Sequence, residues 1–300
     1  MRKRWGVSER QVKQWISLVD IEASGSNYRP FLHVRDVPSM GRSAIIWGLK
    51  TGRHHQFLSD LEYFYSLLAE YSRSVIDIRE QYPLLPREET IAIAKEIGIC
   101  HPCYPGSNTP IVMTTDMVLT VRGISSQTSL LPLSIKYASA LAPVDGNKEE
   151  YERTIEKLQI EKRYWLRRCP EWLLSTDKML PLNKVHNLDA LRTAVIAEEC
   201  DWLNPLLPKF AHAFRIVWSE RKRLKDIYAE TAIELRVTPA DIAFLFGRAV
   251  WLRLLPIDLD SIVLHDEFPV VLTPDVARTA QRGLPGWSAC SRQRFKECPC

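Results

Sequence analysis

The stretch IVMTTDMVLTVRGISSQTSLLPLSIK, residues 111–136, decides the fold expected for this chain. Two apolar runs rich in β-branched residues, 111–121 and 130–140, flank a turn at 122–129 that carries glycine and serine. Runs of this kind separated by turn residues are typical of neighbouring β-strands. The sequence therefore predicts two strands that can pair with each other.

Helices and further strands are expected on both sides of this pair. Helical spacing and capping residues predict helices, and β-branched runs ended by proline or glycine predict strands. The helices are expected at 8–17, 58–72, near 88–98 and at 148–169, the strands at 74–85 and 171–176, and a hairpin within 43–57. This order predicts a mixed α/β first half, residues 1–177.

The second half, residues 178–273, reads as mostly helical. Thr238-Pro239 supplies an N-cap followed by proline at the first helical position, which opens the last of these helices. The helices are expected at 187–200, 205–223, 225–236 and 239–253, with extended runs at 254–259 and 261–272. Successive helices followed by a short hairpin fit a winged-helix-like domain, and they also fit other small helical domains. We expect a tail at 274–300.

Composition limits the function classes. The formal net charge of +4 permits a nucleic-acid partner without requiring one. The sequence contains no run of about 18 apolar residues, so we expect no membrane span. The basic N-terminus lacks the apolar segment of a secretory signal. Seven cysteines without such a signal fit free thiols in a cytoplasmic protein. Cys100-His101-Pro102-Cys103 resembles half of a zinc site, but the terminal Cys290, Cys298 and Cys300 make a weak second half.

The chemistry is expected where the two central strands meet. Strand alternation puts Val112, Thr114, Asp116 and Val118 on one face, and pairing would bring Asp116 beside Ser134 and Lys136. Glu62 would bring a second carboxylate from the preceding helix. An acid on one strand, a lysine on its neighbour and a helical glutamate are the arrangement of a metal-dependent nuclease.

Phosphodiester hydrolysis explains these residue types. Two carboxylates, with the main-chain carbonyl of Ile135, would hold Mg²⁺, which prefers oxygen ligands and makes a bound water more acidic. Lys136 would stabilise negative charge on the phosphate. Each residue also has a simpler interpretation: Ser59-Asp60-Leu61-Glu62 matches a capping box, and Lys136 could be a solvated strand residue.

The chain from about 24 to 177 resembles the TnsA family, the endonuclease subunits of heteromeric cut-and-paste transposases. The resemblance rests on NYRPFLHVRDVPSMGRSAIIWGLKTGRHHQFLSDLE, SVIDIREQYPLLP, GICHP, TTDMVL and the segment from EKLQIEKRYW to LLSTDK. It implies a restriction-endonuclease-like fold and Mg²⁺-dependent cleavage of the 5′ strands at transposon ends, with Mn²⁺ as a substitute ion.

The resemblance also assigns residues and partners. It places the family's catalytic residues on Glu62, Asp116 and Lys136, while Ser134 stands where the family commonly has glutamine. The implied partners are double-stranded DNA, a transposase subunit that cuts the 3′ ends, and an ATP-dependent regulator of transposition. The basic run formed by Arg215, Arg221, Lys222, Arg223 and Lys225, with Trp218 among it, could contact phosphates or an acidic partner, or be a solvated surface.

Two other functions fit the same residues. One is another nuclease of the same fold, of the restriction or repair type. The other is a DNA-binding regulator in which the acids are structural.

Overall fold

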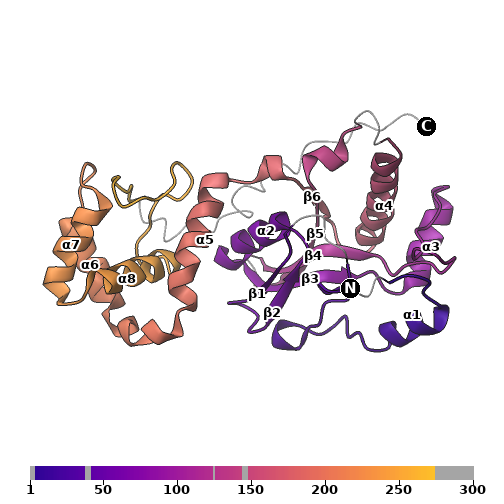
Figure 1. The fold of residues 1–300 in the computed structure, drawn as a ribbon, viewed down its shortest axis with the longest axis horizontal. Helices are drawn as coiled ribbons and strands as arrows, with labels where there is room; N and C mark the ends of the chain where they lie inside the picture. Colours follow the sequence, from indigo (N-terminus) through magenta and orange to yellow (C-terminus); the bar gives the residue numbers. More distant parts are fainter. Residues whose placement is uncertain (1–3, 38–41, 124–125, 144–147, 274–300) are drawn as a thin grey trace. The chain divides into compact units, whose positions relative to one another are not determined.

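The computed structural model describes residues 4–37, 42–123, 126–143 and 148–273, and it divides the chain into two compact units between Leu180 and Pro181. The first unit contains the sheets and the second is helical (Figure 1). The mixed α/β first half and the mostly helical second half are confirmed. Within the described residues, no helix has the length and apolar character needed to cross a membrane.

A mixed sheet forms the centre of the first unit. Its strands lie in the order β3 (Val75–Pro83), β4 (Thr114–Arg122), β5 (Thr128–Ile135) and β6 (Leu173–Ser175). The β3–β4 and β4–β5 pairs are antiparallel, whereas β6 is parallel to β5. The two apolar runs predicted as strands at 111–121 and 130–140 therefore pair directly, with Met117 opposite Leu133.

A separate hairpin of β1 (Ala44–Trp47) and β2 (His54–Phe57) lies beside this sheet. In Figure 1 the hairpin and α2 (Asp60–Tyr71) lie on one side of the sheet, and α3 (Arg87–Glu96) and α4 (Lys148–Leu166) lie on the other. The short helix α1 (Glu9–Ile16) lies near the N-terminus.

Aromatic residues fill the layer between the sheet and α3 and α4. Tyr164 and Trp165 of α4 are 2% and 1% exposed and belong to one buried cluster with Tyr82 and Val118 of the sheet. Burial of each large apolar side chain contributes about 1.5–3 kcal/mol. The helical spacing expected for 148–169 thus directs one face of α4 onto the sheet.

Strict alternation along β4 was a wrong expectation. Thr115 bonds to Glu161 and Trp165 of α4, and Val118 belongs to the same buried cluster as Trp165, although alternation assigns these two strand residues to opposite faces. The regular pleat is broken where Gln81, which lies opposite this part of β4, has a φ of 48°. A positive φ reorients successive side chains relative to an extended strand.

The second central strand is shorter than predicted. It ends at Ile135 rather than continuing to 140, and residues Ala138–Leu141 form a short 3-10 helix. The carboxylate of Asp177 accepts the N–H of Ala138 at 2.6 Å, so this N–H is satisfied outside a strand ladder.

The second unit is built from four α-helices among the described residues: α5 (Leu182–Ile196), α6 (Leu207–Val217), α7 (Leu224–Leu235) and α8 (Pro239–Trp251). Thr238 caps α8 in a reciprocal capping box with Asp241, as predicted. Phe210, Phe214 and Phe246 pack in the core of this unit.

The helix predicted at 187–200 begins earlier and ends sooner. Residues Glu198–Leu206 instead form 3-10 turns. Buried Arg248 of α8 donates hydrogen bonds to the carbonyls of Ala194, Ala197 and Cys200, and these bonds satisfy the carbonyl groups at the end of α5.

The hairpin expected at the end of this unit is absent from the described residues. The two extended runs meet only in an isolated bridge, Ile257 with Leu272. Pro256 and Pro269 provide no N–H for a ladder, and the Asp258 carboxylate accepts the N–H groups of Asp260 and Ser261 in a local turn. The hairpin that would form the wing of a winged-helix domain is therefore not present in the described residues up to 273. The tail expected at 274–300 lies outside the described residues.

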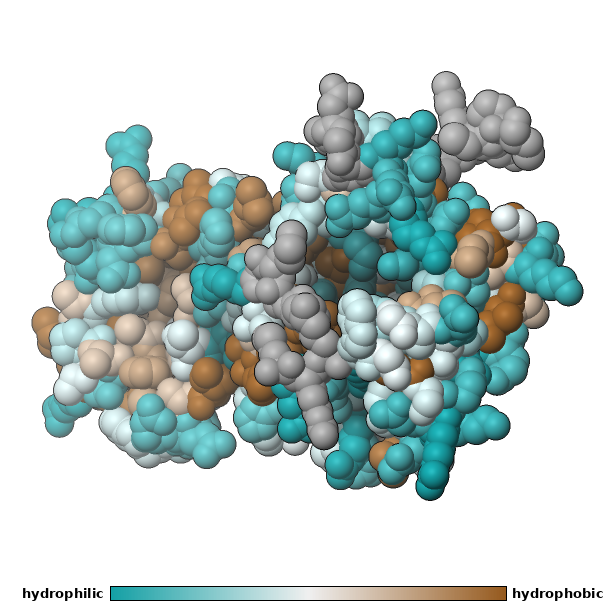
Figure 2. Space-filling model, turned by 45° about the vertical axis from the view of Figure 1, so that its right-hand side comes forward, coloured by the Kyte–Doolittle hydropathy of each residue, from teal (hydrophilic) through white to brown (hydrophobic). Residues whose placement is uncertain are grey.

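Hydrophilic residues cover most of the face shown in Figure 2, with small hydrophobic areas among them. The exposed apolar side chains include Trp5, Ile45 and Trp47 in the first unit and Trp202, Ile216 and Ile233 in the second.

Candidate active site

Asp116 and Lys136 meet at the edge where β4 begins and β5 ends. The Nζ atom of Lys136 lies 2.6 Å from Oδ2 of Asp116, and the N–H of Ile135 donates to the same oxygen at 2.7 Å. The other carboxylate oxygen, Oδ1, accepts no hydrogen bond from the described residues. The Asp116 side chain is 13% exposed and that of Lys136 is 33% exposed, so both remain accessible from solvent.

Glu62 lies in the first turn of α2 and caps the helix. Ser59 is the N-cap residue and its hydroxyl accepts the N–H of Glu62. In return, the hydroxyl of Ser59 donates to Oε1 of Glu62 at 3.1 Å. The second oxygen, Oε2, accepts the N–H of Leu58 at 3.0 Å and the side-chain amide of Gln81 at 3.1 Å.

This arrangement limits how Glu62 could bind a cation. A carboxylate oxygen has two lone pairs. Both lone pairs of Oε2 are engaged, whereas Oε1 has one partner and keeps one lone pair. Glu62 is therefore able both to cap its helix and to provide one ligand atom.

A third carboxylate, that of Glu161 of α4, lies near Asp116 and Lys136 and was not predicted. It is 5% exposed, accepts the hydroxyl of Thr115 at 2.7 Å and receives the indole N–H of Trp172 at 3.3 Å. The available signal was its place between Leu158 and Trp165, inside the apolar stripe of the helix. A glutamate in such a stripe needs buried partners, and only the folded chain identifies them.

The acids outnumber the cations in this cluster. Burial and the charge of Asp116 raise the pKa of Glu62 to about 8, and the same two causes raise the pKa of Glu161 to about 7. Burial opposes the charge of Lys136, but the carboxylates of Asp116, Glu161 and Glu62 outweigh it and raise the pKa of this lysine. Three carboxylates around one ammonium group favour an additional cation.

Ser134 contributes a buried hydroxyl to the same region. Its Oγ atom is inaccessible to solvent and makes no hydrogen bond of normal geometry within the described residues. It nevertheless lies close enough to Glu161 to favour the ionised carboxylate.

The donor set suits a small divalent cation. Oδ1 of Asp116 and Oε1 of Glu62 are oxygen ligands with free lone pairs, and Mg²⁺ is commonly bound by one or two carboxylates with water and phosphate oxygens as its other ligands. The described residues contain no group of three or more His, Cys, Asp or Glu side chains placed to hold a metal ion. Two carboxylates would therefore leave the other positions around such an ion to water and substrate oxygens.

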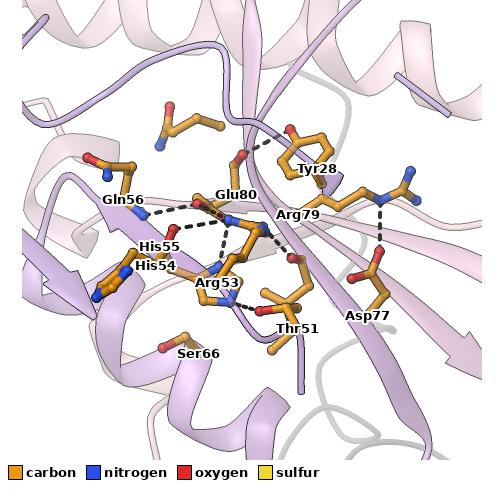
Figure 3. A network of polar contacts seen from close by, with 12 residues as sticks. Tyr28, Thr51, Arg53, His54, His55, Gln56, Ser66, Asp77, Arg79 and Glu80 are labelled. Carbon is orange, nitrogen blue, oxygen red and sulfur yellow. Dashed lines mark hydrogen bonds and ion pairs between the residues drawn. The ribbon is translucent and has the colours of Figure 1, made fainter. Parts of the chain in front are cut away.

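A buried ion-pair network fastens the hairpin to β3 (Figure 3). Glu80, which is fully buried, accepts hydrogen bonds from Arg53 at 2.7 and 2.8 Å and contacts Nδ1 of His55 at 2.6 Å. The other ring nitrogen of His55 contacts the hydroxyl of Thr51 at 2.9 Å. His55 is therefore structural, whereas its neighbour His54 lies against exposed Trp47.

The sequence also suggested two other binding sites, a zinc half-site and a basic run. Cys100 and Cys103 are exposed, and the zinc half-site has no further ligands among the described residues; the terminal cysteines lie outside them. In the basic run, Lys222 pairs with Glu230, Arg223 with Asp226, and Lys225 with Glu267. Much of its positive charge is therefore compensated within the second unit.

Comparison with known proteins agrees with this architecture. Residues 72–177 match the family model described as "TnsA-like endonuclease N terminal", which places this region in an endonuclease class. The chain is also 37% identical over 196 residues to the Transposon Tn7 transposition protein TnsA of Escherichia coli. Over this matched region the chain is similar to TnsA and to the TnsA-like endonuclease N-terminal family.

The match is partial in both directions. It covers 65% of this chain and 63% of the relative's length. Asp116, Ser134, Lys136 and Glu161 lie inside the region matched by the family model, whereas Glu62 precedes it.

Proposed function

We propose that this chain is a Mg²⁺-dependent DNA endonuclease that cleaves the 5′ strands at transposon ends, acting with a partner transposase. The observation that carries the proposal is the cluster of Glu62, Asp116 and Glu161 around Lys136, with free carboxylate lone pairs on the first two. Similarity to TnsA over the matched region supports the same activity.

The chain's own residues have separate roles in this proposal. Oδ1 of Asp116 and Oε1 of Glu62 would hold the ion, and the carbonyl of Ile135 would be a further ligand. The bound ion supplies Lewis-acid polarisation of the phosphate and a more acidic water. Lys136 is one-third exposed, so its ammonium group can exchange Asp116 for a phosphate oxygen and stabilise the charge that develops there.

The remaining assignments follow from this role. Residues 1–177 would be a restriction-endonuclease-like nuclease domain, with Ser134 acting through a water rather than as a direct ligand. Residues 178–273 would be the module that contacts DNA, the transposase or an ATP-dependent regulator. Mn²⁺ would replace Mg²⁺, because it takes the same oxygen ligands.

The test is strand cleavage on a plasmid that carries transposon ends, in Mg²⁺ or Mn²⁺, with the partner transposase and regulator present. Asp116→Ala and Lys136→Ala should each lower 5′-strand cleavage about 100-fold or more, the usual loss for a residue that stabilises transition-state charge. Lys148→Ala and Glu152→Ala remove the same charges from an exposed pair on α4 and should leave cleavage unchanged.

The outcomes separate the three functions. Full cleavage by Asp116→Ala and Lys136→Ala would show that the acids are structural and would favour a non-catalytic regulator. Cleavage that needs no partner proteins and ignores transposon ends would favour a restriction or repair nuclease. Loss of cleavage in the two site variants alone, and only with the partners present, supports the proposal.

A further inference from the structure

Gln81 of β3 has a backbone conformation that its residue type does not favour. Its φ is 48°, in the left-handed region, and the residue is 1% exposed. A non-glycine residue in this region is strained, and such residues cluster at functional sites. Its carbonyl leaves the sheet and accepts the N–H of Phe31 at 3.2 Å.

The turned backbone directs two successive side chains toward the hairpin and α2. Glu80 contacts Arg53 and His55 of the hairpin, and Gln81 contacts Glu62 of α2. Tyr82 then returns to the opposite side and joins the buried cluster that contains Trp165. Regular alternation would have directed Gln81 away from Glu62.

The neighbours of Gln81 define how its amide is oriented. The hydroxyl of Thr114 donates to the amide oxygen at 3.3 Å, and the amide nitrogen donates to Oε2 of Glu62 at 3.1 Å. A carboxylate that binds a cation is ionised and only accepts hydrogen bonds, so in that state the amide nitrogen must face Glu62. The amide and the N–H of Leu58 then occupy both lone pairs of Oε2 and leave the free lone pair on Oε1.

We propose that Gln81 is a positioning residue that fixes the Glu62 carboxylate so that Oε1 is directed to the divalent cation. This inference rests on the proposed function, because it assigns Glu62 as a ligand. Groups that hold a ligand carboxylate in this way typically change metal affinity about 10–100-fold when they are removed.

The test is direct Mn²⁺ binding to the full-length protein, measured by calorimetric titration without DNA. Gln81→Met keeps the length of the side chain and removes the amide. Gln81→Asn keeps an amide that is one methylene too short to reach Glu62, but asparagine tolerates the left-handed conformation well. A purely structural role would therefore be preserved in Gln81→Asn.

We expect both variants to bind Mn²⁺ about tenfold more weakly. Their kcat at saturating Mn²⁺ should fall much less than their metal affinity, because the carboxylate remains present. Thr114→Val, which removes the hydroxyl that orients the amide, should show a smaller loss of affinity in the same direction.

Glu62→Gln distinguishes failure of this inference from failure of the proposed site. If Glu62→Gln loses Mn²⁺ binding while both Gln81 variants bind as wild type, the positioning role is overturned and the site stands. If Glu62→Gln binds as wild type, the site itself is wrong. Should both Gln81 variants fail to fold, unchanged Mn²⁺ affinity in the near-isosteric Thr114→Val would overturn the inference.

Discussion

At the scale of single residues, Glu62 shows that a structural and a chemical role need not exclude each other. One oxygen takes two hydrogen bonds from the protein, and the other takes one from the cap residue Ser59. The capping interpretation of the sequence and the ligand interpretation are therefore compatible, because they use different lone pairs.

The raised pKa values of Glu62 and Glu161, about 8 and about 7, lead to a pH prediction. Between about pH 5 and pH 8 the folded state binds more protons than the unfolded state, so the stability of the metal-free protein should fall as pH rises through this range. Thermal unfolding in chelator should show a Tm that decreases from pH 5 to pH 8. Glu62→Gln and Glu161→Gln should each flatten this slope.

Mn²⁺ should reverse the trend, because the ion binds the ionised carboxylates. Its stabilising effect is expected to be larger at pH 8 than at pH 6. An increase in Tm caused by Mn²⁺ that is equal at both pH values would contradict the coupling of these acids to the ion.

At the scale of elements, the cap of α2 joins helix stability to the site. Ser59→Ala removes the acceptor for the N–H of Glu62 and the donor to its Oε1, so unfolding free energy should fall by about 1 kcal/mol. Urea denaturation measures this loss, and Mn²⁺ affinity should change as well.

Thr238→Ala is the matched control for this prediction. Thr238 caps α8, in the other unit, with a similar pair of hydrogen bonds: its hydroxyl accepts the N–H of Asp241 and donates to the Asp241 carboxylate. It should cost a similar free energy without changing Mn²⁺ affinity. Equal effects of the two substitutions on the metal would contradict a link between the α2 cap and the site.

The link between the hairpin and the sheet yields a second prediction at this scale. Burial alone would raise the pKa of Glu80, but bonds from Arg53 and His55 outweigh it and lower the value to about 2. Arg53→Met should destabilise the protein by about 3–5 kcal/mol, because it leaves a buried charge without this partner.

Urea denaturation would measure that loss, and Arg53→Met/Glu80→Gln should recover part of it because the double variant removes the charge as well. Hydrogen exchange should rise in β2 before it rises in β4. A double variant less stable than Arg53→Met would show that the ion pair does not dominate this contact.

At the scale of the whole molecule, the division at Leu180 and Pro181 separates two units that each bury their own aromatic residues. Units of this kind commonly unfold as separate cooperative transitions. Scanning calorimetry should therefore resolve two transitions, and Mn²⁺ should raise only the one that belongs to the first unit. A single transition that shifts as a whole would show that the units unfold together.

Much of the first unit could be predicted because its signals are local. The capped start of α2, the proline-ended β3 and the turn between β4 and β5 are written in adjacent residues, and each element formed near its expected place. The end of the second unit was harder to predict, because prolines and a turn at Asp258 occupy the place where a hairpin was expected. Short extended runs do not carry enough periodicity to specify a strand pair.

By itself the sequence determined the order of the elements and brought Asp116 and Lys136 onto neighbouring strands, since chain spacing controls periodicity, capping and turns. Only the tertiary structure decided that Glu161 joins them, that Gln81 turns its backbone toward Glu62, and that Lys222, Arg223 and Lys225 of the basic run pair with acids. These contacts join residues distant in sequence, and the free energy of burying or pairing a polar group depends on those distant partners.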